Sequence, residues 1–258
     1  MLGFAACGGD WVLFADADVE VEKGWLERAI ETAAREPALG GLWGRIEEWF
    51  VDGAGERRGS RDLYLVGDGD RPSEYLATLA FYRREALLEA GGYDARLSSE
   101  EDFELGLRLT RAGVGLWAIA PLAARHWSAP RPSFGELSRR WSTGLCFGQG
   151  QVLRLYFGRP GFGALLARQR LNLATLAMWL LGGVALVVSL VRGDLRPLAA
   201  WAVLPLAVLL VMSVRKKSAR LALHSLLAWT LNGFGLLVGL WRVPRDQHRA
   251  FPGGELPC

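Results

Sequence analysis

Residues 8–18 read GGDWVLFADAD, and this stretch decides the fold class. Residues 11–15 are apolar and rich in strand-forming types, and they stop abruptly at Asp16 and Asp18. A short apolar run of this kind predicts a buried strand that delivers acids at its carboxyl end. Ligands of open α/β sheets bind outside the carboxyl ends of strands. The stretch therefore predicts an α/β domain with an acidic site at the end of this strand.

The residues that follow alternate between helix-like and strand-like patterns. Apolar spacing predicts helices over residues 25–33, 84–90 and 99–113, and strand-like segments over residues 40–50 and 114–120. Residues 75–82 form a further apolar stretch. Residues 52–73 are rich in Gly, Asp and Arg and predict a long surface loop.

The second half of the chain has the composition of a membrane segment. Uncharged apolar runs cover residues 171–191, 197–214 and 221–241, each long enough to cross a bilayer of ~30 Å. The third run is the weakest because it holds His224, Thr230 and Asn232. We expect a partial α/β domain over residues 1–133, an amphipathic membrane-proximal segment over 134–170, two to three transmembrane helices over 171–241, and a tail over 242–258.

Basic residues flank these runs unevenly. Four precede the first run and four follow the second, whereas only Arg192 and Arg196 lie between them. The positive-inside rule then predicts a multi-pass protein of the inner or plasma membrane, with its α/β domain in the cytoplasm. The tail, with Arg242, Arg245 and Arg249, would lie outside if the third run spans. Because the rule disfavours that placement, either the third run is re-entrant or the rule is overridden there.

Composition argues against several other classes of protein. The net charge is only +3, and the basic excess surrounds the apolar runs, so no nucleic-acid partner is expected. Cys7, Cys146 and Cys258 lie far apart and form no CxxC pair, which argues against a zinc site or a disulfide framework. The first residues lack the basic region of a signal peptide.

Two acidic motifs are candidates for chemistry. Asp16 and Asp18 could bind Mg²⁺ or Mn²⁺ together with substrate phosphates, or they could be a polar turn that ends a strand. Asp102, in Ser99-Glu100-Glu101-Asp102, could be a general base. The alternative for this motif is a capping box, with Ser99 at the helix start and Asp102 returning the hydrogen bond.

Two basic or titratable motifs follow. His126 could be a third metal ligand beside Asp18, although a lone histidine is often structural. Arg140 and Trp141 could bind a pyrophosphate, because arginine forms a bidentate fork, or they could belong to a membrane-surface helix with an interfacial tryptophan.

Together these motifs resemble, in order, the family-2 glycosyltransferases with the GT-A fold. GGDWVLFADADVEVEKGWLERAI is similar to the family's strand, DxD motif and helix. FYRREALLEAGGYD resembles the segment before the catalytic acid, and SSEEDFELGLRLTRAG resembles the ED motif with its helix. His126 lies where many members place a histidine, and the apolar runs fit the membrane-bound members. The likeness covers roughly residues 1–156 and implies a partial GT-A, Rossmann-like domain followed by transmembrane helices.

The resemblance implies an inverting transfer of sugar from a nucleotide-sugar to a membrane-proximal acceptor, in exopolysaccharide or glycolipid synthesis. Asp16 and Asp18 would bind the Mg²⁺ or Mn²⁺ ion and the diphosphate, with His126 as a further metal ligand. Asp102 would be the base, with Glu101 beside it. Arg140-Trp141 resembles the end of the QxxRW motif, but Leu137 replaces its glutamine, so processive synthesis is not implied.

Family members place a strand and a base-binding acid well before DxD, which is reached here by residue 18. We therefore expect the first half of the nucleotide-binding domain to be missing from this chain. A non-catalytic membrane-anchored partner subunit, or an inactive fragment, is the first alternative. A transport or assembly protein with a Ca²⁺- or Mg²⁺-binding module is the second, although the three apolar runs hold no acid that would mark an ion pathway.

Overall fold

The computed structural model describes residue 4, residues 7–128 and residues 133–242. These residues form two compact units. The first contains residues up to 96 together with 100–128, and the second contains residues 97–99 together with 133–242. The expected tail lies outside the described residues, except for Arg242.

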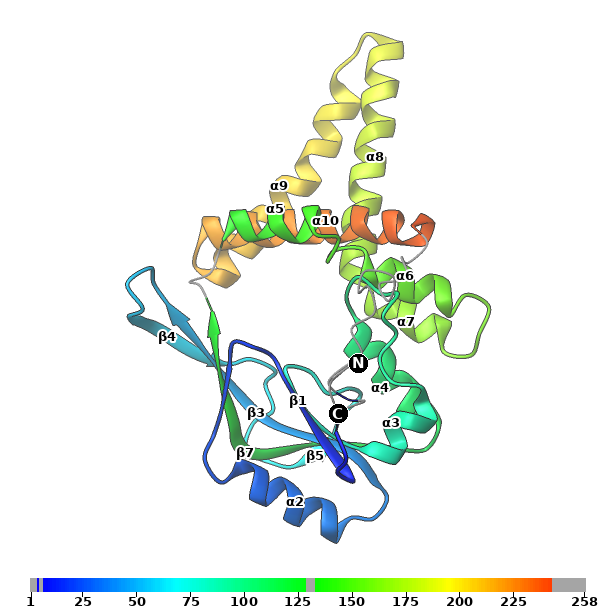
Figure 1. The fold of residues 1–258 in the computed structure, drawn as a ribbon. Helices are drawn as coiled ribbons and strands as arrows, with labels where there is room; N and C mark the ends of the chain where they lie inside the picture. Colours follow the sequence, from blue (N-terminus) through cyan, green and yellow to red (C-terminus); the bar gives the residue numbers. More distant parts are fainter. Residues whose placement is uncertain (1–3, 5–6, 129–132, 243–258) are drawn as a thin grey trace. The chain divides into compact units, whose positions relative to one another are not determined.

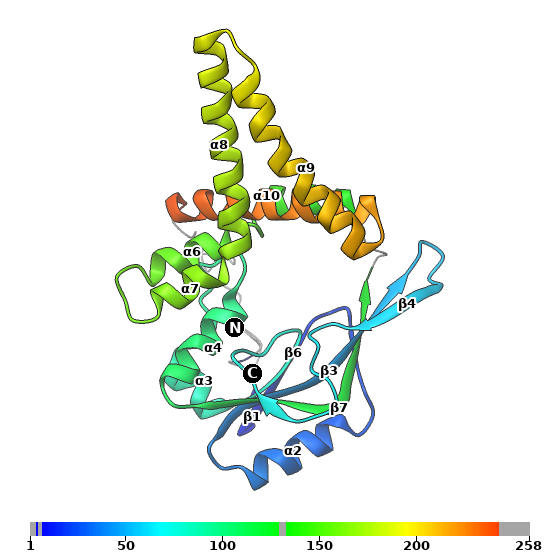
Figure 2. The same cartoon turned by 180° about the vertical axis from the view of Figure 1, so that it is seen from behind.

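The first unit is a mixed sheet with three helices (Figures 1 and 2). The strands run in the order β1-β6-β3-β7-β2, while β4 pairs with β3 and β5 pairs with β7. Their bounds are β1 Trp11–Ala15, β2 Val19–Val21, β3 Leu39–Val51, β4 Arg57–Asp62, β5 Arg71–Pro72, β6 Leu79–Arg83 and β7 Gly115–Ser128. The helices are α2 Trp25–Arg35, α3 Arg84–Ala90 and α4 Glu101–Arg111. The α/β fold class is therefore confirmed.

The core of this unit lies around the central strand β3 and its neighbour β6. Leu42 and Tyr82 are fully buried there, and Trp25 of α2 packs in with 1% of its surface exposed. The amphipathic spacing of α2 explains this packing, because its buried residues Trp25, Ala29 and Ala33 recur every four positions. The Trp25 ring packs directly against Gly44 of β3, where an added Cβ would lie 2.6 Å from the indole Nε1.

Two expectations about the sheet were wrong. The loop expected over residues 52–73 contains β4 and β5, since β3 continues to Val51 and turns back on itself. β1 is not a buried strand: it lies at one end of the strand order and pairs antiparallel with β6, and Val12 is its one buried residue. Only β3 and β7 pair in parallel among the described strands.

The second unit is helical. It comprises α5 Phe134–Ser142, α6 Gly148–Leu155, α7 Phe162–Arg168, α8 Arg170–Arg192, α9 Arg196–Lys216 and α10 Ala219–Trp241. Gly144 lies in the break between α5 and α6, whereas Gly148 and Gly150 lie within α6. In the described part of the chain, α8, α9 and α10 are long and apolar enough to cross a membrane.

Candidate functional site

The carboxyl end of β1 places Asp16 beside β6. The antiparallel register pairs Ala15 with Leu79, so Asp16, which follows β1, meets Thr78, which precedes β6. The Asp16 amide donates a hydrogen bond to the Thr78 carbonyl at 2.9 Å. Thr78 has φ 64°, which is an unfavourable conformation for a β-branched residue. Strained backbone of this kind is often found at functional sites.

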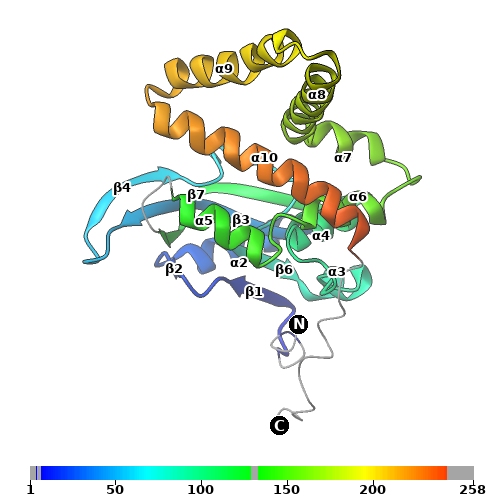
Figure 3. The same cartoon turned by 90° about the horizontal axis from the view of Figure 1, so that it is seen from above.

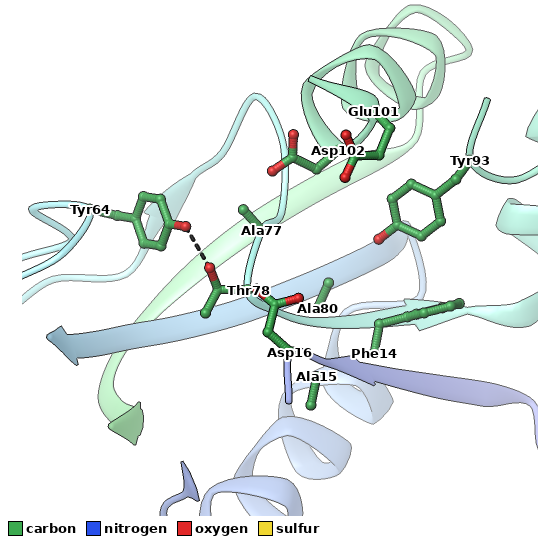
Figure 4. A pocket seen from close by; sticks show the side chains of 10 residues that line it. All are labelled: Phe14, Ala15, Asp16, Tyr64, Ala77, Thr78, Ala80, Tyr93, Glu101 and Asp102. Carbon is green, nitrogen blue, oxygen red and sulfur yellow. Dashed lines mark hydrogen bonds between the residues drawn. The ribbon is translucent and has the colours of Figure 1, made fainter. Parts of the chain in front are cut away.

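A pocket with a cavity volume of about 500 Å³ opens at this point (Figure 4). Side chains from several separate segments line it: the carboxylates of Asp16, Glu101 and Asp102, the hydroxyl-bearing Tyr64, Thr78 and Tyr93, and the apolar Phe14, Ala15, Ala77 and Ala80. The Tyr64 hydroxyl lies 2.6 Å from the Thr78 hydroxyl. The Tyr93 hydroxyl points into the same space (Figure 4). The pocket therefore joins the first acid of DxD to the acids of the ED motif.

The start of α4 presents Asp102 to this pocket. The helix begins at Glu101, and its N-cap residue is Glu100, which has φ 67° and forms no side-chain cap. The Ser99 hydroxyl instead donates a hydrogen bond to the Leu145 carbonyl at 2.8 Å. The capping-box interpretation of this motif is therefore wrong. Asp102 Oδ1 accepts a hydrogen bond from the Phe103 amide at 2.7 Å, which fixes the carboxyl group at the helix start.

Burial sets the protonation of the pocket acids. It raises the pKa of Asp102 from 3.8 to about 7, and the nearby carboxylates of Glu101 and Glu100 add to the rise. The pKa of Asp16 is also raised, first by burial and then by the charge of Asp18. A carboxyl group with a pKa near neutrality can accept a proton and release it again at physiological pH.

The second acid of DxD faces a histidine. β2 pairs antiparallel with β7 so that Val19 lies opposite His126, and the Trp127 amide donates to the Asp18 carbonyl at 3.0 Å. As a result, His126 Nε2 lies 3.4 Å from Asp18 Oδ2. The Asp18 side chain is 56% exposed and that of His126 is 16% exposed, so the pair is open to solvent mainly on the acid's side.

A hydrogen-bonded chain orients the other face of His126. Glu48 is fully buried and accepts hydrogen bonds from Arg61 Nε at 2.5 Å and from the Ser128 hydroxyl at 2.9 Å. The Ser128 oxygen lies 3.0 Å from His126 Nδ1. Because the hydroxyl has a single proton and directs it to Glu48, His126 must donate from Nδ1. In the neutral imidazole, Nε2 on the side of Asp18 is then the nitrogen that can bind a metal.

The geometry fits a partial metal site. No group of three or more His, Cys, Asp or Glu side chains is arranged around a common metal position among residues 7–128 and 133–242. Asp18 and His126 supply two donors at most. Two protein ligands suit Mg²⁺ or Mn²⁺ when substrate phosphates and water complete the coordination shell. The chain therefore brings Asp18 and His126 together, while Asp16 faces the pocket.

Arg140 and Trp141 lie on α5 of the second unit. The Trp141 ring packs edge-on against Phe147, with centroids 5.3 Å apart. Neither residue lines the pocket described above. Sequence patterns gave no signal for Tyr64, Thr78, Glu48 or Ser128, because contacts between segments far apart in the chain set their places.

Residues 1–91 match the family model described as glycosyl transferase family 2. The chain is also 32% identical, over 152 residues, to pre-mycofactocin glycosyltransferases from two strains of Mycobacterium tuberculosis, CDC 1551 / Oshkosh and ATCC 25618 / H37Rv. That match covers 52% of this chain and 32% of each relative, so the chain spans about a third of the length of these curated relatives.

A solved structure shares the fold. The mannosyltransferase PcManGT from Pyrobaculum calidifontis, solved in complex with GDP-Man and Mn²⁺, is similar with a TM-score of 0.55 and 21% identity. The likeness covers 93% of this chain and 65% of that chain. Residues 1–91 are therefore similar to the family-2 glycosyltransferases, and the fold is a GT-A-like α/β domain followed by helices apolar enough to span a membrane.

Proposed function

We propose that the chain is the catalytic and membrane-anchoring part of an inverting glycosyltransferase, which moves a sugar from a nucleotide-sugar to a membrane-proximal acceptor. The observation that carries the proposal is the shared pocket: Asp16, Glu101 and Asp102 come from distant parts of the sequence and line one cavity. A capping role for the ED motif does not explain this arrangement, because Ser99 makes no cap.

Asp102 is the proposed base. Its carboxylate removes the proton of the acceptor hydroxyl as the hydroxyl oxygen attacks the anomeric carbon. The bond between that carbon and the diphosphate oxygen breaks at the same time, and its electron pair leaves with the diphosphate. A single displacement inverts the anomeric configuration. Glu101, next to Asp102, contributes negative charge that helps to raise the pKa of this base.

Asp18 and His126 are the proposed ligands of Mg²⁺ or Mn²⁺. When bound, the ion would neutralise charge on the departing nucleoside diphosphate. The structural relative PcManGT contains GDP-Man and Mn²⁺, which supports a nucleotide-sugar donor with a divalent ion. Asp16 is a second DxD acid for the donor, and Arg140 with Trp141 remain candidates to bind the diphosphate.

The lining of the pocket favours an uncharged sugar. Its charged members are the carboxylates of Asp16, Glu101 and Asp102, with no lysine or arginine among the described lining residues. A hexuronate would meet these carboxylates without a cation to pair with it. Phe14 and the alanines of the lining offer apolar surface to the sugar ring.

The acceptor is proposed to be a lipid-linked or membrane-proximal saccharide, in exopolysaccharide or glycolipid synthesis. The helices of the second unit support attachment to a cell membrane as a multi-pass protein. The basic residues around α8 and α9 support a cytoplasmic α/β unit.

Calorimetric titration of the protein with UDP and with GDP, in the presence and absence of Mn²⁺, tests the donor site. We expect binding of at least one nucleotide that requires Mn²⁺, that Asp18→Ala abolishes and that Asp68→Ala retains. Asp68 is a suitable control because it is an exposed acid outside the pocket lining. A wild-type protein that binds neither nucleotide with Mn²⁺ would contradict the proposal and favour a non-catalytic partner subunit.

A further inference from the structure

Within the second unit, α10 lies across the direction of α8 and α9. Helices α8 and α9 form a hairpin that extends to one side. Helix α10 runs crosswise at the base of this hairpin, next to α5 (Figures 1 and 2). The view along the hairpin shows α5 and α10 side by side (Figure 3). Composition alone makes α10 a candidate span, with 23 residues and a mean hydropathy of 1.5 in its most apolar window.

Contacts along α10 show where its two ends lie. Near its N-terminus, the His224 ring packs against Phe134 of α5 with centroids 5.6 Å apart, and Arg220 lies over the same ring at 6.0 Å. Near its C-terminus, Arg154 of α6 donates to the carbonyls of Leu240 and Trp241 at 3.3 and 3.4 Å. The segment that contains α5 and α6 therefore accompanies α10 from end to end.

That accompanying segment cannot cross a bilayer. The segment precedes α8, the first helix that can span. Its helix α5 contains an ion pair between Glu136, whose side chain is 42% exposed, and Arg139, whose side chain is 57% exposed. Ionised side chains that face hydrocarbon are costly. A spanning α10, about 34 Å long at 1.5 Å per residue, would take this polar segment through the membrane with it.

Protein contacts account for much of the apolar character of α10. Gly235 and Gly239 approach the backbone of Cys146 and Phe147 so closely that a Cβ at either glycine would clash with a carbonyl. By contrast, no residue of α9 is buried, as expected for a helix that faces lipid. The large exposed residues of α10 recur at positions that share one side of a helix, and they form the α10 stripe: Leu223, Leu227, Phe234, Leu237 and Trp241.

We propose that α10 is a membrane-surface helix whose α10 stripe binds lipid at the boundary between headgroups and acyl chains. The chain then crosses the bilayer twice, through α8 and α9, and Arg242 returns to the side of Lys217. Exposed basic residues at both ends of the helix, Arg220 and Arg242, suit anionic headgroups. This topology also removes the conflict with the positive-inside rule, because Arg242, Arg245 and Arg249 join the other cytoplasmic basic residues.

The proposal is independent of the chemistry proposed for the α/β unit, and thiol accessibility in cells tests it. All proteins carry Cys7→Ser and Cys146→Ala, which leaves the natural Cys258 as one reporter. The Leu195→Cys and Lys217→Cys proteins carry Cys258→Ser as well, so that each has a single cysteine. A membrane-impermeant maleimide should label Leu195→Cys in intact cells, and should label Lys217→Cys and Cys258 only after permeabilisation. Labelling of Cys258 in intact cells, with Lys217→Cys protected, would overturn the proposal.

Spin-label depth in vesicles that contain anionic lipid gives a second test. Nitroxides at positions 223, 234 and 241 of the stripe should report one shallow depth. A depth that increases toward position 234 and decreases again at position 241 would show a spanning helix and contradict the proposal.

Discussion

Replacement of Asp102 by asparagine should stabilise the protein at alkaline pH. The carboxyl group is held in a buried position that raises its pKa from 3.8 to about 7. Above pH 7 the folded protein must therefore keep a charge where burial disfavours one. Asparagine has nearly the same shape, carries no charge and can still accept the hydrogen bond from the Phe103 amide.

The size of the effect follows from the pKa shift. A rise from 3.8 to about 7 corresponds to at most about 4 kcal/mol, at ~1.4 kcal/mol per pKa unit. The unfolded chain releases the Asp102 proton near pH 3.8, whereas the folded chain keeps it until about pH 7. The free energy of unfolding of the wild type therefore decreases between these values, and the variant lacks this contribution to the pH dependence.

Chemical unfolding of both proteins in detergent, at about pH 4, 6 and 8, measures the difference. The variant's advantage should be near zero at the lowest pH and greatest at the highest. Glu101→Gln is the control, because the Glu101 side chain is exposed and should give no comparable gain. An Asp102→Asn protein no more stable than the wild type at pH 8 would refute the view that burial keeps this acid in a raised-pKa state.

Three further predictions concern transfer, the metal pair and the core. The rate of sugar transfer should increase about tenfold for each pH unit as the pH rises toward 7, and level off above pH 7, because Asp102 must be ionised to act as a base. A rate that does not change between pH 5 and 7 would contradict this prediction. Ser128→Ala should weaken Mn²⁺ affinity by about 10–100-fold in calorimetry, because His126 loses the partner of its Nδ1, and unchanged affinity would show that the hydroxyl does not orient the ring. Gly44→Ala should lower the free energy of unfolding by about 1–3 kcal/mol through the clash with Trp25, whereas Gly53→Ala, where a Cβ meets nothing within 4 Å, should be neutral.

Patterns along the sequence predicted those parts of the fold that local chemistry determines. The run from Trp11 to Ala15 is a strand that ends just before Asp16, and the spacing of Trp25, Ala29 and Ala33 marks a helix. The prediction of a loop after Asp52 was wrong because β4 and β5 are short and polar. Pairing with β3 and β7 stabilises them, and they show no apolar periodicity that the sequence could reveal.

The candidate site was only partly predictable for the same reason. Asp16, Asp18, Asp102 and His126 stand in recognisable motifs, but Thr78 reaches Asp16 only through the register of β1 with β6. Glu48 reaches Ser128 through the parallel pairing of β3 with β7, which no local pattern specifies. The side chains that orient a site thus depend on contacts between segments far apart in the chain.

The most direct test of the proposed function is sugar transfer by the native gene product in its own membranes. Labelled nucleotide-sugars are supplied with Mn²⁺, and label is followed into the lipid and saccharide fractions for the wild type and for Asp102→Asn. We predict transfer by the wild type with inversion at the anomeric carbon, and its loss in the variant while Mn²⁺-dependent nucleotide binding persists. Transfer by Asp102→Asn at the wild-type rate, or retention of the anomeric configuration, would contradict the assignment of Asp102 as the base of an inverting glycosyltransferase.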